Sequence, residues 1–237
     1  MLNVDAALDH LNLQSALSAL SARRPVFHAE ADFQHELAWQ LHSAHTDLGV
    51  RLEVRVPHPS RPGHRERVDL LLLTQNGPVA VEVKYPTDSL RAVLGGEVFD
   101  LPRQGAQDIT GYDVVKDIYR VEHFVRSGMA VAGVVVVVTN DASYWTDPAH
   151  GRATGAAAFR LYDGTTLQGE RSWGAASGPG TRKGRDEPIG LMDAYTLRWS
   201  DYSLVPGAPR GRFRSLLVEV GATPADATAT RCGARRT

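Results

Sequence analysis

The stretch RVDLLLLTQNGPVAVEVKYP, residues 67–86, contains two apolar runs separated by the polar letters TQNG. Two such runs around an Asn-Gly pair predict a β-hairpin. Three charged residues interrupt the apolar pattern: Asp69 in the first run, and Glu82 and Lys84 in the second. Charges are costly to bury in an apolar hairpin, so these three require a physical explanation.

The register of the hairpin decides whether the three charges meet. Side chains alternate between the two faces of a strand, so Glu82 and Lys84 share a face. A two-residue turn at Asn76-Gly77, or a four-residue loop over 75–78, places Asp69 opposite Lys84 and diagonal to Glu82. A loop of three or five residues would send Asp69 to the other face. The favoured register therefore predicts two carboxylates and one ammonium close together on one face.

Two neighbouring carboxylates repel each other, and a divalent cation neutralises them better than a single lysine does. Mg²⁺ prefers oxygen ligands and is usually held by one or two carboxylates, waters and a substrate phosphate. A lysine beside such an ion can orient or deprotonate an attacking water, or offset charge that develops on a phosphate. The alternative is a salt-bridged polar face of the sheet that binds no ligand.

Periodicity outside the hairpin predicts an α/β fold with a mixed central sheet flanked by helices. Apolar residues at helical spacing predict a first helix that is apolar on both sides or broken near Asn12, and a second that begins near Asp32. Strict alternation from Val50 predicts a strand, and a helix from Asp113 to Gly128 leads into a strand that is apolar on both faces. Residues 88–110 are expected to form a loop or a small hairpin.

A single domain is expected over residues 1–221, with a core at about 30–140 and a strand-rich extension over 141–221. Short strands are expected at AAFRLYDG, AYTLRWSDYS and FRSLLVEV, either extending the sheet or forming a small annex. The Gly- and Ser-rich residues 174–190 are expected to be mobile, and the tail over 222–237 to be disordered.

Asp69, followed after a gap by Glu82-Val83-Lys84, resembles the PD-(D/E)xK nucleases of the restriction endonuclease-like superfamily, with Val68 in place of the motif's proline. The resemblance spans about residues 30–140 and implies a core of order α-β-β-β-α-β. It further implies a Mg²⁺- or Mn²⁺-dependent endonuclease that hydrolyses phosphodiester bonds. Asp69 and Glu82 would hold the metal, Lys84 would serve the chemistry, and Glu36 would add an acid from the first core helix. A solvated helix edge is the alternative for Glu36.

Partner classes are limited by charge and composition. With 26 Lys and Arg against 27 Asp and Glu, the chain has no global field for nucleic acid, so binding would need a local patch. The candidate contacts are Arg65, Arg67, Lys116 and Arg120, although a solvated, charge-paired face is the alternative for the last two. DNA is the expected substrate. RNA, or a nuclease-like binding or assembly module without catalysis, are the alternatives.

Composition also bears on the compartment. Cys232 is the single cysteine, so no disulfide framework is expected. The N-terminus lacks a signal-peptide pattern and no apolar run is long enough for a membrane span. A soluble cytoplasmic protein with no membrane partner is expected, and both a monomer and a homodimer remain open.

Overall fold

The computed structural model describes residues 8, 11–58, 63–148 and 154–221, so Cys232 and the tail expected to be disordered lie outside the described residues. A six-stranded sheet of order β1-β2-β3-β6-β10-β9 forms the centre of the fold. β3 and β6 are parallel, whereas the other four neighbouring pairs are antiparallel. The strands are β1 (Gly49–Pro57), β2 (Arg65–Thr74), β3 (Gly77–Lys84), β6 (Ala132–Thr139), β9 (Trp199–Leu204) and β10 (Arg212–Gly221). The prediction of a mixed sheet is confirmed.

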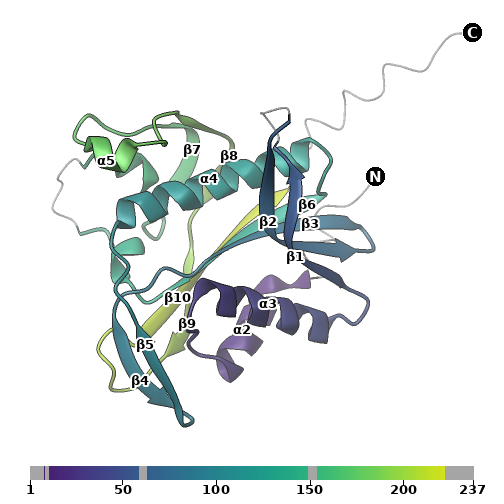
Figure 1. Ribbon diagram of the computed structural model, residues 1–237, viewed down its shortest axis with the longest axis vertical. Coiled ribbons are helices and arrows are strands. Elements are labelled where there is room, and N and C mark those ends of the chain that lie inside the picture. Colours follow the sequence, from purple (N-terminus) through teal and green to yellow (C-terminus); the bar gives the residue numbers. More distant parts are fainter. Residues whose placement is uncertain (1–7, 9–10, 59–62, 149–153, 222–237) are drawn as a thin grey trace, which may run out of the picture.

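Helices cover both faces of this sheet. α2 (Leu13–Arg23) and α3 (Glu30–Ala44) lie on one face, and α4 (Gln107–Arg126) crosses the other, as Figure 1 shows. Phe33 and Leu37 of α3 are fully buried against one face, and Val114 and Ile118 of α4 against the other. The flanked α/β architecture follows from these two apolar stripes, because each helix must bury its stripe against the sheet.

The N-terminal helical region is broken at Asn12, as one of the two sequence alternatives predicts. Asn12 adopts a left-handed conformation, and its side chain caps α2 by accepting a hydrogen bond from the Ser15 amide. α3 begins at Glu30 rather than near Asp32. Asp32 lies within the first turn, where its carboxylate accepts a hydrogen bond from the amide of His28 at 2.9 Å. The earlier start places Glu30 on the helix.

The β2–β3 turn differs from the predicted one by one pair. Thr74 pairs with Gly77 and Leu73 with Pro78, so the two-residue turn is Gln75-Asn76. Pro78 thereby falls in a pair that exchanges no hydrogen bonds across the hairpin, where its missing N–H costs nothing. The shift is two residues, so the predicted pairing of Asp69 with Lys84 is wrong, and Asp69 comes level with Glu82. An even shift leaves the alternation of faces unchanged.

Residues 88–110 contain the small hairpin that was one sequence alternative, formed by β4 (Leu90–Leu94) and β5 (Glu97–Leu101). In Figure 1 this hairpin extends from the body of the fold. α4 then begins at Gln107, six residues before the predicted start. The first turns of α4 pack on the C-terminal part of the fold and do not continue the apolar stripe. Gly111 lies so close to the backbone of Phe159 that a Cβ on Gly111 would approach the carbonyl oxygen of Phe159 to 2.3 Å.

The C-terminal part contains both arrangements that the sequence allows, strands that extend the central sheet and a small annex. β9 and β10 extend the central sheet, while β7 (Thr166–Arg171) and β8 (Ile189–Thr196) form a separate two-stranded sheet. The strand predicted at AAFRLYDG is wrong, because Ala157–Phe159 forms a 3-10 turn. The two remaining elements are a 3-10 turn at Ala142–Tyr144 and α5 (Pro179–Arg182). Buried Glu122 of α4 anchors the small sheet by accepting hydrogen bonds from Met192 and Tyr195.

No helix within the described ranges is long and apolar enough to cross a membrane.

Candidate active site

β2 and β3 separate at the point where the charged residues of the hairpin lie. The last pair of their ladder is Leu70 with Val81. Beyond that pair, Asp69 contacts β3 through its side chain and not through its own backbone. Its Oδ2 accepts a hydrogen bond from the amide of Val83 at 2.8 Å. This bond holds the carboxylate of Asp69 beside the segment that carries Glu82 and Lys84.

A kink in the neighbouring strand accompanies this opening. The β1–β2 ladder skips Glu53, which has a φ of 52° and would otherwise pair with Asp69. On β2, Leu70 packs with the α3 side of the core, whereas Val68 packs with the α4 side. The strand therefore changes faces at Asp69, and a positive φ in a non-glycine residue is the kind of local strain that persists where the surrounding structure fixes it. Strand periodicity gives no signal for such a kink.

Glu82 and Lys84 project from β3 toward α4. Glu82 is 1 % exposed, and its Oε1 lies 3.1 Å from Nη2 of Arg120. Lys84 Nζ lies 2.9 Å from Oδ2 of Asp117. Asp117 and Arg120 also pair with each other at 3.0 Å, and Arg120 Nε bonds Glu66 of β2 at 2.9 Å. The structure thus brings together Asp69, Glu82 and Lys84, as predicted, and surrounds them with charges from α4.

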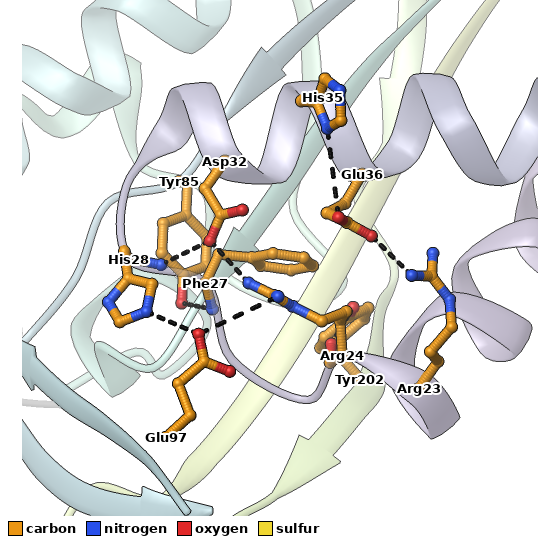
Figure 2. Close-up of polar contacts among 10 residues, drawn as sticks. All are labelled: Arg23, Arg24, Phe27, His28, Asp32, His35, Glu36, Tyr85, Glu97 and Tyr202. Atoms are coloured by element: carbon orange, nitrogen blue, oxygen red, sulfur yellow. Dashed lines mark hydrogen bonds and ion pairs between the residues drawn. The ribbon is translucent and has the colours of Figure 1, made fainter.

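The acid that α3 contributes to this cluster is Glu30, not Glu36. Glu30 Oε2 accepts a hydrogen bond from the amide of Tyr85 at 2.9 Å, and its carboxylate interacts electrostatically with Lys84 and Asp69. Glu36 points to α2, where it pairs with Arg23 at 2.7 Å (Figure 2). Glu36 lies six residues along the helix from Glu30, so it projects from a different side. Sequence reasoning missed Glu30 because it placed the start of the helix at Asp32.

Carboxylates outnumber cations in this cluster. The acids are Glu30, Glu66, Asp69, Glu82 and Asp117, and the bases are Lys84 and Arg120. Burial raises the pKa values of Glu30, Asp69 and Glu82, and Asp117 raises the pKa of Glu82 further. The carboxylate of Asp69 also raises the pKa of Glu82, because two neighbouring negative charges repel each other. A divalent cation bound between the two acids would favour the ionised form of both.

The two basic groups carry their charges throughout the neutral range. Burial opposes the charge on Lys84, but Asp117 and Glu30 outweigh burial and raise its pKa. The pKa of Arg120 is likewise raised, because Glu82, Asp117 and Glu66 outweigh its burial. Lys84 is therefore an ammonium that donates hydrogen bonds and is poorly suited to remove a proton from water.

Three buried carboxylate oxygens at this site lack hydrogen bonds of good geometry: Glu66 Oε1, Glu82 Oε1 and Asp117 Oδ2. Two of them still lie beside a cation, Glu82 Oε1 at 3.1 Å from Arg120 and Asp117 Oδ2 at 2.9 Å from Lys84. Buried carboxylate oxygens beside two carboxyl groups with raised pKa values fit a hard cation that takes oxygen ligands. Among the residues that the structure describes, no group of three or more His, Cys, Asp or Glu side chains is arranged to hold a metal by itself. A metal here would therefore need further ligands from water or substrate.

An open cleft of about 420 Å³ leads to Lys84 between β2 and α4. Its lining consists of Glu66, Arg67, Lys84, Asp113, Lys116, Asp117 and Arg120. Of the four predicted nucleic-acid contacts, Arg67 and Lys116 lie exposed on the lining, and Arg65 is exposed at the start of β2. Arg120 also lines the cleft, but three acids engage its guanidinium. A larger hollow of about 660 Å³ beside residues 142–148 is lined by none of these residues.

Searches against protein-family models, curated proteins and solved structures find no match to this chain.

Proposed function

We propose that this protein is a metal-dependent nuclease of the restriction endonuclease-like fold, hydrolysing phosphodiester bonds in DNA. The observation that carries the proposal is the excess of buried carboxylates around Asp69 and Glu82, with the single ammonium of Lys84 beside them. The order α3, β1, β2, β3, α4, β6 supports it, since this is the core order that the resemblance implies, with the β4–β5 hairpin inserted before α4.

Asp69 and Glu82 would hold Mg²⁺ or Mn²⁺, and water and a phosphate oxygen would complete the coordination. When bound, such an ion polarises the phosphoryl group and lowers the pKa of a coordinated water. Glu30 takes the place expected of Glu36 as the acid from the first core helix. It lies close enough to adjust the charge of the site, although it already accepts a hydrogen bond from Tyr85.

Lys84 would contribute as a fixed ammonium. Its Nζ is held by Asp117 at 2.9 Å and borders the open cleft, so it can donate hydrogen bonds to a phosphate oxygen as negative charge grows there. Of the roles that the sequence allows for this lysine, charge stabilisation and water orientation fit the geometry better than proton removal. Exposed Arg67 and Lys116 supply positive charge beside the acidic residues of the cleft, as binding of a phosphate backbone would require.

The deciding experiment is a gel assay of the purified protein on plasmid, linear duplex, single-stranded DNA and RNA, with Mg²⁺, with Mn²⁺ and with EDTA. Metal-dependent cleavage of DNA that is lost in EDTA and in an Asp69→Asn variant is the expected outcome. Cleavage of RNA alone would change the substrate class. Nucleic-acid binding without any cleavage would favour the non-catalytic module.

A further inference from the structure

Of the charged α4 side chains that line the cleft, Arg120 and Asp117 each contact one proposed catalytic group on β3. Arg120 Nη2 lies 3.1 Å from Glu82 Oε1, and Asp117 Oδ2 lies 2.9 Å from Lys84 Nζ. The two α4 residues also pair with each other at 3.0 Å, one helical turn apart. A single helix therefore contacts both the proposed metal-binding acid and the proposed catalytic lysine.

Arg120 is fixed more firmly than a mobile counter-ion would need to be. Its Nε bonds Glu66 at 2.9 Å, its Nη1 bonds Asp117 at 3.0 Å, and its Nη2 donates to the carbonyl of Arg67. The guanidinium side chain is 15 % exposed and spans β2, β3 and α4. A planar fork that is held at several donors sets the orientation of any carboxylate it touches.

We infer that Arg120 and Asp117 are positioning residues, the first for the Glu82 carboxylate and the second for the Lys84 ammonium. The inference rests on the proposed function and extends the site to α4. For Arg120, the simpler alternative is that it acts only as a counter-ion to Glu82. A counter-ion competes with a metal for Glu82, so its removal would strengthen metal binding. A positioning residue holds the ligand in place, so its removal would weaken metal binding although a positive charge is lost.

The Arg120 test measures Mn²⁺ affinity of the full chain by calorimetry, without substrate. Arg120→Met removes the charge, and Arg120→Lys keeps the charge but loses the fork. Val115→Ala, on the buried face of the same helix, is the matched control for weakened packing. We expect both Arg120 variants to bind Mn²⁺ about 10- to 100-fold more weakly and the control to bind like wild type. Binding by Arg120→Met as tight as wild type, or tighter, overturns the role. Should Arg120→Met not fold, Arg120→Lys decides, because it keeps the positive charge and loses the planar fork.

The Asp117 test separates binding from turnover. Asp117→Asn should lower kcat by on the order of 100-fold, since a misplaced catalytic group costs that much, while Mn²⁺ affinity and KM stay within about threefold. Asp117→Glu should restore part of the rate. A loss of kcat no larger than that of Val115→Ala overturns the role of Asp117.

Wild-type behaviour distinguishes failure of the proposed function from failure of this inference. A wild type that neither binds Mn²⁺ nor cleaves nucleic acid removes the proposed function and the inference with it. A wild type that binds and cleaves, with variants that match it, removes the inference alone.

Discussion

Two charged networks flank α3, and they differ in balance and burial. In the network of Figure 2, each acid meets a base: Glu36 pairs with Arg23 at 2.7 Å, Asp32 with Arg24 at 2.8 Å, and Glu97 with His28 at 2.8 Å. Most of these side chains are partly or well exposed.

The network around Asp69 and Glu82 is instead buried and has more acids than bases. Matched pairs near the surface join elements and contribute little individually. An excess of buried carboxylates destabilises the metal-free protein, and a bound cation would remove this unfavourable free energy. The charges of the first network therefore hold α2, α3 and β5 together. The charges around Asp69 and Glu82 are instead ones that a function would require.

The largest expected effect comes from Lys84. We predict that Lys84→Ala lowers the rate of nucleic-acid cleavage by about 10³-fold, because the lysine would stabilise charge only in the transition state. Mn²⁺ affinity should not weaken, since an ammonium cannot ligate a metal. Single-turnover assays at saturating metal measure the rate. Arg23→Gln, in the balanced network, is the matched loss of one cation and should cleave like wild type. A Lys84→Ala rate within about tenfold of wild type would exclude the proposed role.

Glu82→Gln should separate metal binding from stability. We expect Mn²⁺ affinity to fall by about 100-fold or more, since a ligand is lost. Without metal, the thermal midpoint Tm should stay level or rise by about 1–4 °C, because the amide removes a repelling charge while Arg120 keeps Asp117 and Glu66. Differential scanning calorimetry in EDTA, then with Mn²⁺, gives both quantities. A large loss of Tm in EDTA would show that Glu82 stabilises the fold as an ordinary ion-pair partner.

The pH dependence of stability follows from the raised pKa values of Glu30, Asp69 and Glu82. The folded protein holds protons that the unfolded chain releases near pH 4, so the metal-free fold loses stability as pH rises through the folded pKa values. We therefore expect Tm in EDTA to decrease as pH is raised from the unfolded-state pKa values near 4 up to about pH 8, and to decrease less in Glu82→Gln. Saturating Mn²⁺ should flatten the dependence, because the metal binds the ionised carboxylates. A wild-type Tm in EDTA that does not change over this range would contradict the raised pKa values.

The sequence predicts the parts of this site that depend on alternation and fails where local geometry departs from it. Glu82 and Lys84 are recovered because alternation along β3 places them on one face, whereas Asp69 reaches them through its hydrogen bond to the Val83 amide, at the point where β2 changes faces. The kink at Glu53 and the exact partner of Asp69 are not recoverable, since neither leaves a periodic signal.

The contribution of α4 is also only partly visible in the sequence. The apolar stripe of α4 predicts the helix, but Asp117 and Arg120 have the spacing of an ordinary surface pair. Their contacts with β3 depend on how α4 crosses the sheet, and that crossing is set by side-chain packing over the whole interface.

The smallest effects test which acid of α3 belongs to the site. Glu30→Gln should weaken Mn²⁺ binding by a few-fold, about 2- to 10-fold, since its carboxylate interacts with Asp69 and Lys84 without a predicted ligand role. Glu36→Gln should leave metal affinity and cleavage unchanged, and a double-mutant cycle with Arg23→Gln should give a coupling of about 0.2–1 kcal/mol, as for other exposed pairs. Both variants exchange Glu for Gln on the same helix, although Glu30 lies in the first turn, where the amide also loses a favourable interaction with the helix dipole. Weakened metal binding in Glu36→Gln together with normal binding in Glu30→Gln would return the helix acid to Glu36. It would also require α3 to rotate or shift when metal binds, because Glu36 now faces α2.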